Sequence, residues 1–122
     1  MVNKMESNEL KLMVGDWVIY EGFKREVTVD LLMILELNKD KWYNIHPIKL
    51  TPEIMEKIQT LRYNQFYRIY YVDNVGFDIN DKGECNVNIE HNYWRKVLTI
   101  QYLHQLQQLI RLFTGKEIVV KW

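Results

Sequence analysis

Apolar and polar residues alternate along much of the first half of the chain, and this alternation predicts β-strands. Val14–Tyr20 alternates after a Gly–Asp start. From Val27 to Leu37 every odd-numbered position is apolar, which predicts a long strand with one buried face, or two strands broken near Asp30. A helix over 31–37 is the competing interpretation, but the β-branched start and the period of two favour a strand.

A third strand is predicted after a polar turn. The turn occupies Asn38–Lys41, and Trp42–Leu50 then returns as a strand, with Pro47 at a position that suits an edge or a strand end. Together with a turn at Glu21–Gly22, these strands predict a small antiparallel meander or barrel over residues 12–50.

Two helices are predicted in the chain. The first covers 52–60, because Thr51 can cap it and Pro52 suits the first helical position. The second covers 101–114 and ends at Gly115, a residue type that commonly terminates helices. Its apolar residues recur at heptad-like spacing and predict one buried stripe, made of Leu103, Leu106, Ile110 and Phe113. We expect this helix to anchor the fold and to display its Gln-rich side outward.

The second half of the chain also contains several strand patterns. Asn80–Gly83 predicts a hairpin turn between two of them. The predicted strands cover 66–72, 75–79, 84–90, 94–100 and 116–122. The whole pattern predicts an α+β fold made mostly of antiparallel strands, with two helices. We expect a flexible N-terminus over 1–9 and a single domain over 10–122.

The composition indicates a folded chain with balanced charge. Of the 122 residues, 48% are hydrophobic and 26% are charged, which disfavours disorder. Sixteen Lys and Arg residues balance sixteen Asp and Glu residues, so the formal net charge is zero. Because binders of nucleic acids or anionic membranes depend on many cationic contacts, zero net charge disfavours both classes.

Cysteine usage and hydropathy indicate a cytoplasmic location. Cys85 is the only cysteine, so an intramolecular disulfide is impossible and a reducing compartment is expected. Residues 1–9 contain no apolar stretch of the kind found in secretory signals. The longest aliphatic run, Leu31–Leu35, is far shorter than the roughly 20 residues that a membrane-spanning helix needs.

Candidate nucleophiles are few. Ser7 is the only serine, and Cys85 is the only thiol. Cys85 could meet His46, His91 or His104 in space, but a buried, inert thiol is far commoner than a catalytic one. We therefore predict no catalytic residues and expect a non-enzymatic protein.

Metal and cofactor motifs are not recognisable in the sequence. Cys85 and His91 lie six positions apart without a second pair of ligands, unlike a structural zinc site. Asp78–Gly83 begins like a calcium-binding loop, but Lys82 and Ile89 occupy positions that need calcium ligands. The glycines occur singly and form no phosphate-binding loop. We predict neither a metal nor another cofactor.

Aromatic and basic residues interleave in two segments of the second half. Such residues can stack on a single-stranded nucleic acid and neutralise it. The candidate nucleic-acid-binding residues are Arg62, Tyr67, Arg68, Tyr70, Trp94, Arg95 and Lys96. The alternative is strands whose aromatic side chains face the core and whose basic side chains face solvent, and the neutral charge favours that alternative.

Candidate partner-binding residues lie on the polar side of the 101–114 helix. They are Gln101, His104, Gln105, Gln108 and Arg111. Uncharged amides desolvate more cheaply than charges, so this side could dock against a protein partner. Plain solvation of exposed amides is the simpler interpretation.

Three stretches stand out in order along the chain. They are Glu9–Val18, Pro47–Glu53, and Tyr102–Leu109 followed by Leu112–Glu117, which reads Y-hydrophobic-HQLQ…TGKE. In this order they resemble a family of small proteins common in the prophages and mobile elements of gut anaerobic bacteria. Gln59-Thr60-Leu61 stands where that family usually has Gly-Phe. No activity is established for the family, so the resemblance carries no catalytic residue over.

A second, shorter resemblance concerns the N-terminal strands. Gly15–Val18, followed by Gly22 and Val27, resembles the first hairpin of small SH3-like barrels. Our leading functional hypothesis is a non-enzymatic accessory protein of a phage or mobile element that acts through contacts with an unidentified protein. The alternative is a nucleic-acid-binding module that uses the Tyr, Trp and Arg side chains of its strands.

Overall fold

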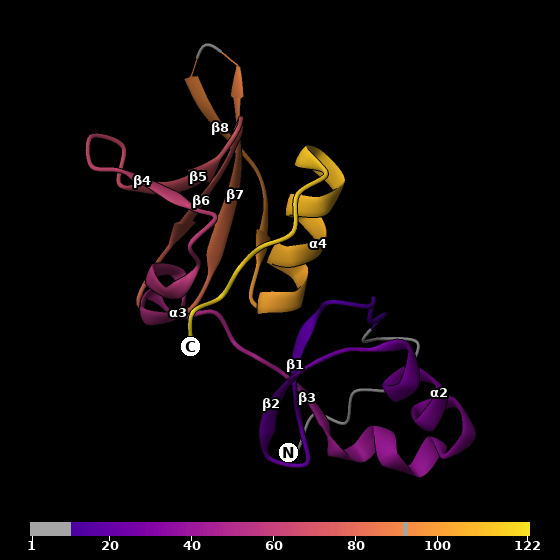
Figure 1. Ribbon diagram of the computed structural model, residues 1–122. Helices are drawn as coiled ribbons and strands as arrows, with labels where there is room; N and C mark the ends of the chain where they lie inside the picture. Colours follow the sequence, from indigo (N-terminus) through magenta and orange to yellow (C-terminus); the bar gives the residue numbers. More distant parts are fainter. Residues whose placement is uncertain (1–10, 92) are drawn as a thin grey trace. The chain divides into compact units, whose positions relative to one another are not determined.

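The chain divides into two compact units in the computed structural model (Figure 1). The structure describes residues 11–91 and 93–122, without the side chains of His91 and Tyr93. The N-terminal unit is Met1–Ile48 and the C-terminal unit is Lys49–Trp122. Both combine helices with an antiparallel sheet, which confirms the predicted α+β class. The expected flexible N-terminus, 1–9, lies outside the described residues. That residues 10–122 form a single domain stays a prediction, because a compact unit need not be an independent domain.

The N-terminal unit contains a three-stranded antiparallel sheet in the order β2-β1-β3. Strand β1 is Trp17–Tyr20, β2 is Phe23–Glu26 and β3 is Ile45–Pro47. The expected turn at Glu21–Gly22 joins β1 to β2, with Tyr20 opposite Phe23. Both turn residues have positive φ, as the tight two-residue hairpin turn requires.

The predicted long strand over 27–37 is wrong, because most of this segment is a helix. Helix α2 spans Val29–Leu37, and the Thr28 side chain caps it by accepting a hydrogen bond from the Leu31 backbone N–H at 3.1 Å. Seven of its nine residues are apolar, VDLLMILEL, so its sequence fits a period of two and a helical period equally well. Burial agrees with the helix: Leu31 and Leu35, one turn apart, are fully buried, whereas Met33, which a strand would place on the same face, is 56% exposed.

The predicted meander or barrel over 12–50 is therefore also wrong. In a meander β2 would lie between β1 and β3, whereas here β1 is central. The sheet stays open, and its buried side chains Val18, Tyr20 and Ile45 form one core cluster with Val27 and the two buried leucines of α2. The helix thus supplies the apolar cover that further strands would supply in a barrel.

The predicted strand over 42–50 is much shorter than expected. A 3-10 helix, η1, spans Lys39–Asn44, and only Ile45–Pro47 pairs with β1. Its first turn is closed by a hydrogen bond from the Lys41 N–H to the Asn38 carbonyl oxygen at 2.9 Å. This winding brings the partly buried Trp42 against the core cluster, which explains why the segment does not start as a strand.

The C-terminal unit begins with the predicted capped helix. Helix α3 spans Pro52–Lys57, slightly shorter than the predicted 52–60, and the Thr51 hydroxyl accepts from the Ile54 N–H at 3.2 Å. A five-stranded antiparallel sheet follows in the order β4-β5-β6-β7-β8, so here the strands do form a meander. The strands are β4 Arg62–Asn64, β5 Ile69–Val72, β6 Val75–Ile79, β7 Cys85–His91 and β8 Tyr93–Ile100.

The strand predicted over 66–72 begins only at Ile69, and β4 was missed by the sequence pattern. The Asn64 side-chain oxygen accepts hydrogen bonds from the N–H groups of Phe66 and Tyr67, at 2.9 and 3.1 Å, which turns the chain. The hairpin turn predicted at Asn80–Gly83 is confirmed. There the Asn80 side-chain oxygen accepts from the N–H groups of Lys82 and Glu84.

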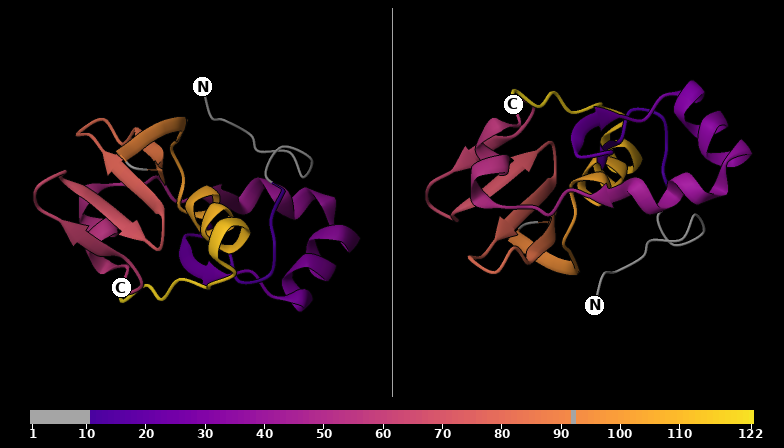
Figure 2. Two further views of the ribbon diagram at one scale, coloured as in Figure 1. Left: turned by 90° about the horizontal axis from the view of Figure 1, so that it is seen from above. Right: turned by 90° about the horizontal axis from the view of Figure 1, so that it is seen from below.

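One face of the five-stranded sheet is buried, and the opposite face is more open. The buried face carries Val72, Val75, Phe77, Cys85, Val87 and Ile100, each at most 5% exposed. Helix α4, Leu103–Thr114, lies alongside the sheet (Figure 2) and contributes the buried Leu103, Leu106 and Ile110. The predicted anchoring helix and its cap at Gly115 are confirmed, but Phe113 is 47% exposed and does not belong to the buried stripe.

The predicted strand over 116–122 is reduced to a single bridge. Val120 pairs with Ile58, flanked by hydrogen bonds from Gln59 N–H to the Val119 oxygen at 2.8 Å and from Lys121 N–H to the Lys57 oxygen at 2.7 Å. The C-terminal tail therefore closes the unit against the residues that follow α3. Within residues 11–91 and 93–122, no helix is both long and apolar enough to cross a membrane.

Candidate binding surfaces

Helix α2 exposes an apolar stripe on the side opposite its buried leucines. Val29, Met33 and Leu37 are spaced four residues apart and are 60%, 56% and 79% exposed. Residues at this spacing share one side of a helix, so the three side chains form a continuous strip, here called the outer stripe. The helix is thus apolar on both sides, although only one side is buried within the N-terminal unit.

Acidic residues border the outer stripe. On a helical wheel Glu36 lies on one side of the stripe and Asp30 on the other, and both side chains are exposed. The Asp30 carboxylate also stabilises the helix N-terminus, where the macrodipole is positive. Lys39 approaches Glu36 only at 3.9 Å, with both side chains mostly exposed, so this ion pair neutralises the border weakly.

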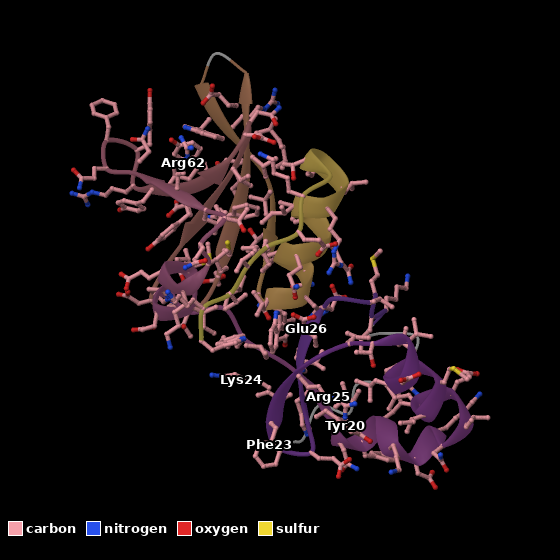
Figure 3. The ribbon with its side chains drawn as sticks, viewed as in Figure 1. Tyr20, Phe23, Lys24, Arg25, Glu26 and Arg62 are labelled. Carbon is pink, nitrogen blue, oxygen red and sulfur yellow. The ribbon has the colours of Figure 1, made fainter. Side chains whose placement is uncertain are left out.

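The β1–β2 hairpin presents a second exposed group of side chains in the same unit (Figure 3). Phe23 is 76% exposed at the start of β2. Arg25 lies on the neighbouring strand from Tyr20, with its guanidinium carbon 5.5 Å from the centre of the tyrosine ring. This cation–π contact covers the edge of the core, which gives Arg25 a structural role.

The predicted partner-binding face of α4 is only partly presented to solvent. His104 is 5% exposed and stacks on Tyr102, with ring centres 5.9 Å apart. The Gln105 side-chain oxygen accepts from the backbone N–H groups of Gln101 and Tyr102, both at 3.0 Å, and so caps the helix. The expectation that the whole polar side faces outward is wrong for His104, and also for Gln107, which is 2% exposed.

The other candidate residues of that face differ in exposure and in side-chain contacts. Gln101 is exposed, Gln108 is half-buried, and Arg111 donates to both carboxylate oxygens of Glu117 at 2.8 and 2.9 Å. Both contacts come from the Nε–H group of Arg111, and this charge-assisted pairing holds the arginine side chain in place. The five candidate residues therefore include a cap, a buried ring and a paired cation, which are roles in packing. Docking through this face stays a prediction.

The seven candidate nucleic-acid-binding residues do not form one surface. Strand pairing places Arg62, Trp94 and Lys96 on the open face of the sheet, Tyr70 and Arg95 on the buried face, and Tyr67 and Arg68 in the β4–β5 loop. A bulge between Val87 and Asn88 contributes to this division, because it sets Lys96 opposite Asn88 and Arg95 opposite Ile89. Simple alternation along β8 does not reveal the bulge.

A row of side chains crosses the open face from one edge strand to the other. Successive pairings align Arg62, Tyr71, Gly76, Asn88 and Lys96. Cations therefore stand on both edge strands of this row, and an aromatic ring and an amide stand between them. Tyr71 is not one of the seven candidate nucleic-acid-binding residues.

Trp94 lies against this row at Gly76. A Cβ at residue 76 would come within 2.4 Å of the Ile69 Cδ1 atom and 3.0 Å of the Trp94 Cζ3 atom. Only glycine therefore lets the indole lie so close to the sheet. The Trp94 ring centre is 6.3 Å from that of Tyr71, and the two rings form a half-buried aromatic pair on the open face.

A hollow of about 360 Å³ opens beside the Arg62 end of the row. Its lining consists of Thr60, Arg62, Tyr71, Val72, Asp73 and Lys116. The Lys116 ammonium pairs with the Asp73 carboxylate at 2.9 Å. The side chain of Arg62, labelled in Figure 3, has neither a hydrogen-bond nor an ion-pair partner among the residues that the structure describes.

The thiol of Cys85 has a packing role. Cys85 is fully buried, and burial, with a smaller contribution from the Asp78 charge, raises the pKa of the thiol to about 12. At neutral pH the nucleophilic thiolate is therefore almost unpopulated. Of its candidate partners, the His91 side chain lies outside the described residues, and His104 stacks on Tyr102.

Cys85 is expected to be unreactive toward a disulfide reagent such as DTNB at pH 8 until the protein is unfolded. The reason is that both access to the sulfur and its ionisation require exposure to water. One thiol per chain should react once guanidinium chloride is added, matching the single cysteine. Rapid reaction of the native protein would show that the thiol is accessible and ionised.

The described part of the chain holds no cluster of three or more His, Cys, Asp or Glu side chains suited to a metal ion. Comparisons with family models, with curated proteins and with solved structures found no match to this chain.

Proposed function

We propose that this protein works by binding another protein, and that the outer stripe of α2 is its docking surface. One observation carries the proposal: α2 is apolar on two opposite sides but is covered on only one of them, with Leu37 79% exposed on the other. Apolar helix faces are normally covered, because exposed apolar area costs free energy. A partner that covers Val29, Met33 and Leu37 would supply the missing contacts.

The acidic border determines the chemistry of the partner. Asp30 and Glu36 flank the stripe, so a complementary surface is apolar at its centre and carries Lys or Arg at its rim. A second copy of this chain is a poorer fit, because it would bring the same acidic borders together. The proposed partner is therefore a different protein with a basic-edged apolar face.

The biological setting that we propose depends on the sequence and not on the docking surface. An accessory role in a phage or mobile element of a bacterial host, in the cytoplasm, is supported by the three resembling stretches and by the single cysteine. A binding role is favoured over catalysis because the only thiol is buried and its pKa is raised.

Synthetic amphipathic helices test the docking surface. Two peptides with the same leucine face, one with lysine and one with glutamate on the polar face, are titrated against the protein by fluorescence anisotropy. We expect the Leu/Lys peptide to bind and the Leu/Glu peptide not to bind, because only the first complements Asp30 and Glu36. The double variant Asp30→Asn, Glu36→Gln should weaken binding of the Leu/Lys peptide.

A matched pair of leucine variants distinguishes specific binding at the outer stripe from nonspecific binding to any exposed leucine. Leu37→Gln should reduce binding about tenfold, since it replaces an apolar contact by an amide. Leu112→Gln changes an equally exposed leucine on α4, 75% exposed against 79%, and should bind like the unchanged protein. Equal losses in the two variants, equal binding of both peptides, or no binding of the Leu/Lys peptide would each overturn the proposal.

A further inference from the structure

The hollow beside Tyr71 has a charged lining and is separate from the outer stripe of α2. Its lining carries two cations, Arg62 and Lys116, and one anion, Asp73. Only Lys116 is paired with the anion, so the lining has one excess positive charge. An uncompensated guanidinium beside a cavity is a ready partner for an oxyanion, because its fork of N–H groups can donate two parallel hydrogen bonds.

The aromatic pair lies next to these cations. Tyr71 both lines the hollow and contacts Trp94, with ring centres 6.3 Å apart. Trp94 in turn lies against Gly76, which leaves the outer side of the pair on the open face. Aromatic side chains in such positions stack with planar rings, and nucleobases are the planar rings most often bound in this way.

We propose that the hollow binds a nucleoside monophosphate unit, with its phosphate at Arg62 and Lys116 and its base against Tyr71 and Trp94. The volume of about 360 Å³ lies within the range of small-molecule sites. The Thr60 hydroxyl, which accepts from the Val119 N–H at 2.9 Å, keeps its own O–H free to donate to a ligand oxygen.

The proposed ligand is a single nucleotide unit and not a long strand. The open face also carries exposed acidic side chains on β6 and β7, Asp78 and Glu90, which would repel a second and a third phosphate. The zero net charge of the chain likewise provides little attraction for a long polyanion. A free mononucleotide and the phosphorylated end of a single strand share this chemistry and are two distinct sources of the ligand.

The site lies wholly in the C-terminal unit, so it does not depend on the function proposed for α2.

Calorimetric titration of the full chain with AMP and its fragments tests the proposal. AMP should bind about tenfold more tightly than adenosine, which lacks the phosphate, and than ribose 5-phosphate, which lacks the base. A tetranucleotide with a 5′-phosphate is compared with the same strand ending in a hydroxyl. A preference for the phosphorylated strand over AMP assigns the site to strand ends, and the reverse assigns it to free nucleotides.

Variants identify the groups that bind. Arg62→Gln should weaken AMP binding about tenfold or more, and Arg62→Lys should restore only part of it, since lysine cannot donate in a fork. Trp94→Leu should weaken AMP binding but leave ribose 5-phosphate unaffected. Arg95→Gln is the matched control, because Arg95 is an exposed arginine on the opposite face of the same sheet.

Melting temperatures of all variants establish that the fold is retained. Two results would overturn the proposal. One is an equal loss of AMP binding in Arg62→Gln and Arg95→Gln, which would indicate general electrostatic attraction. The other is binding of inorganic phosphate as tight as that of AMP, which would indicate an adventitious ion only.

Discussion

Leu106→Asp is expected to lower the free energy of unfolding by several kcal/mol, a large part of the stability of a protein this size. Leu106 is fully buried on α4, between the buried Leu103 and Ile110. The variant loses about 2–5 kcal/mol of apolar packing and also places a carboxyl group where no partner is provided. Urea unfolding followed by circular dichroism measures the change.

The penalty should depend on pH. Burial raises the pKa of an introduced carboxyl above its unfolded value of about 3.9, so the destabilisation is largest at neutral pH. It should shrink as the pH falls through the folded-state pKa, because the neutral acid is cheaper to bury. Leu112→Asp is the control: the same change on the same helix, at a leucine that is 75% exposed, should cost about 1 kcal/mol or less. Equal melting of the two variants would contradict the packing of α4.

Gly83→Ala is expected to be more damaging than the same change at Gly22 or Gly115, which also have positive φ. Gly83 has φ +82°, which by itself costs an L-residue roughly 1–2 kcal/mol. An added Cβ would also lie 2.9 Å from the Leu50 carbonyl oxygen and 2.8 Å from the Lys49 Cε atom. The lysine can move aside, but the Leu50 backbone is held by a hydrogen bond from its N–H to the Gln101 oxygen at 2.8 Å.

Gly115→Ala separates backbone strain from steric conflict. Gly115 also has positive φ, +70°, but a Cβ there would meet nothing within 4 Å. Both variants carry the strain of an L-residue with positive φ, so the difference between their free energies of unfolding reports the conflict with Leu50. We expect Gly83→Ala to be the less stable of the two by chemical denaturation. Equal stability would mean that the 80–83 turn can shift away from Leu50.

Elements with strong local signals were predictable from the sequence. Thr51-Pro52 marks the start of α3, and Asn80–Gly83 marks the β6–β7 turn. In α4 the buried leucines recur at a helical period and Gly115 follows them. In each case the residues that decide the structure lie within a few positions of one another, so their chemistry is readable without the rest of the fold.

The errors occurred where local signals were ambiguous. The segment over 29–37 is so uniformly apolar that both strand and helix periods fit it, and it becomes a helix because Leu31 and Leu35 pack on Val18 and Tyr20. The sequence also placed Phe113 in the core stripe, whereas the helix turns it partly to solvent. Tertiary packing overrides weak local preference in such segments.

By itself the sequence determined the α+β class, the α3 and α4 helices and the β6–β7 hairpin, because these depend on neighbours in the chain. Only the tertiary structure decided which apolar residues stay exposed on α2 and which distant residues meet at the hollow. Arg62, Tyr71 and Lys116 line one cavity although Lys116 is more than forty positions from the other two. Exposure and long-range proximity are properties of the folded chain, since each depends on residues that no local pattern links.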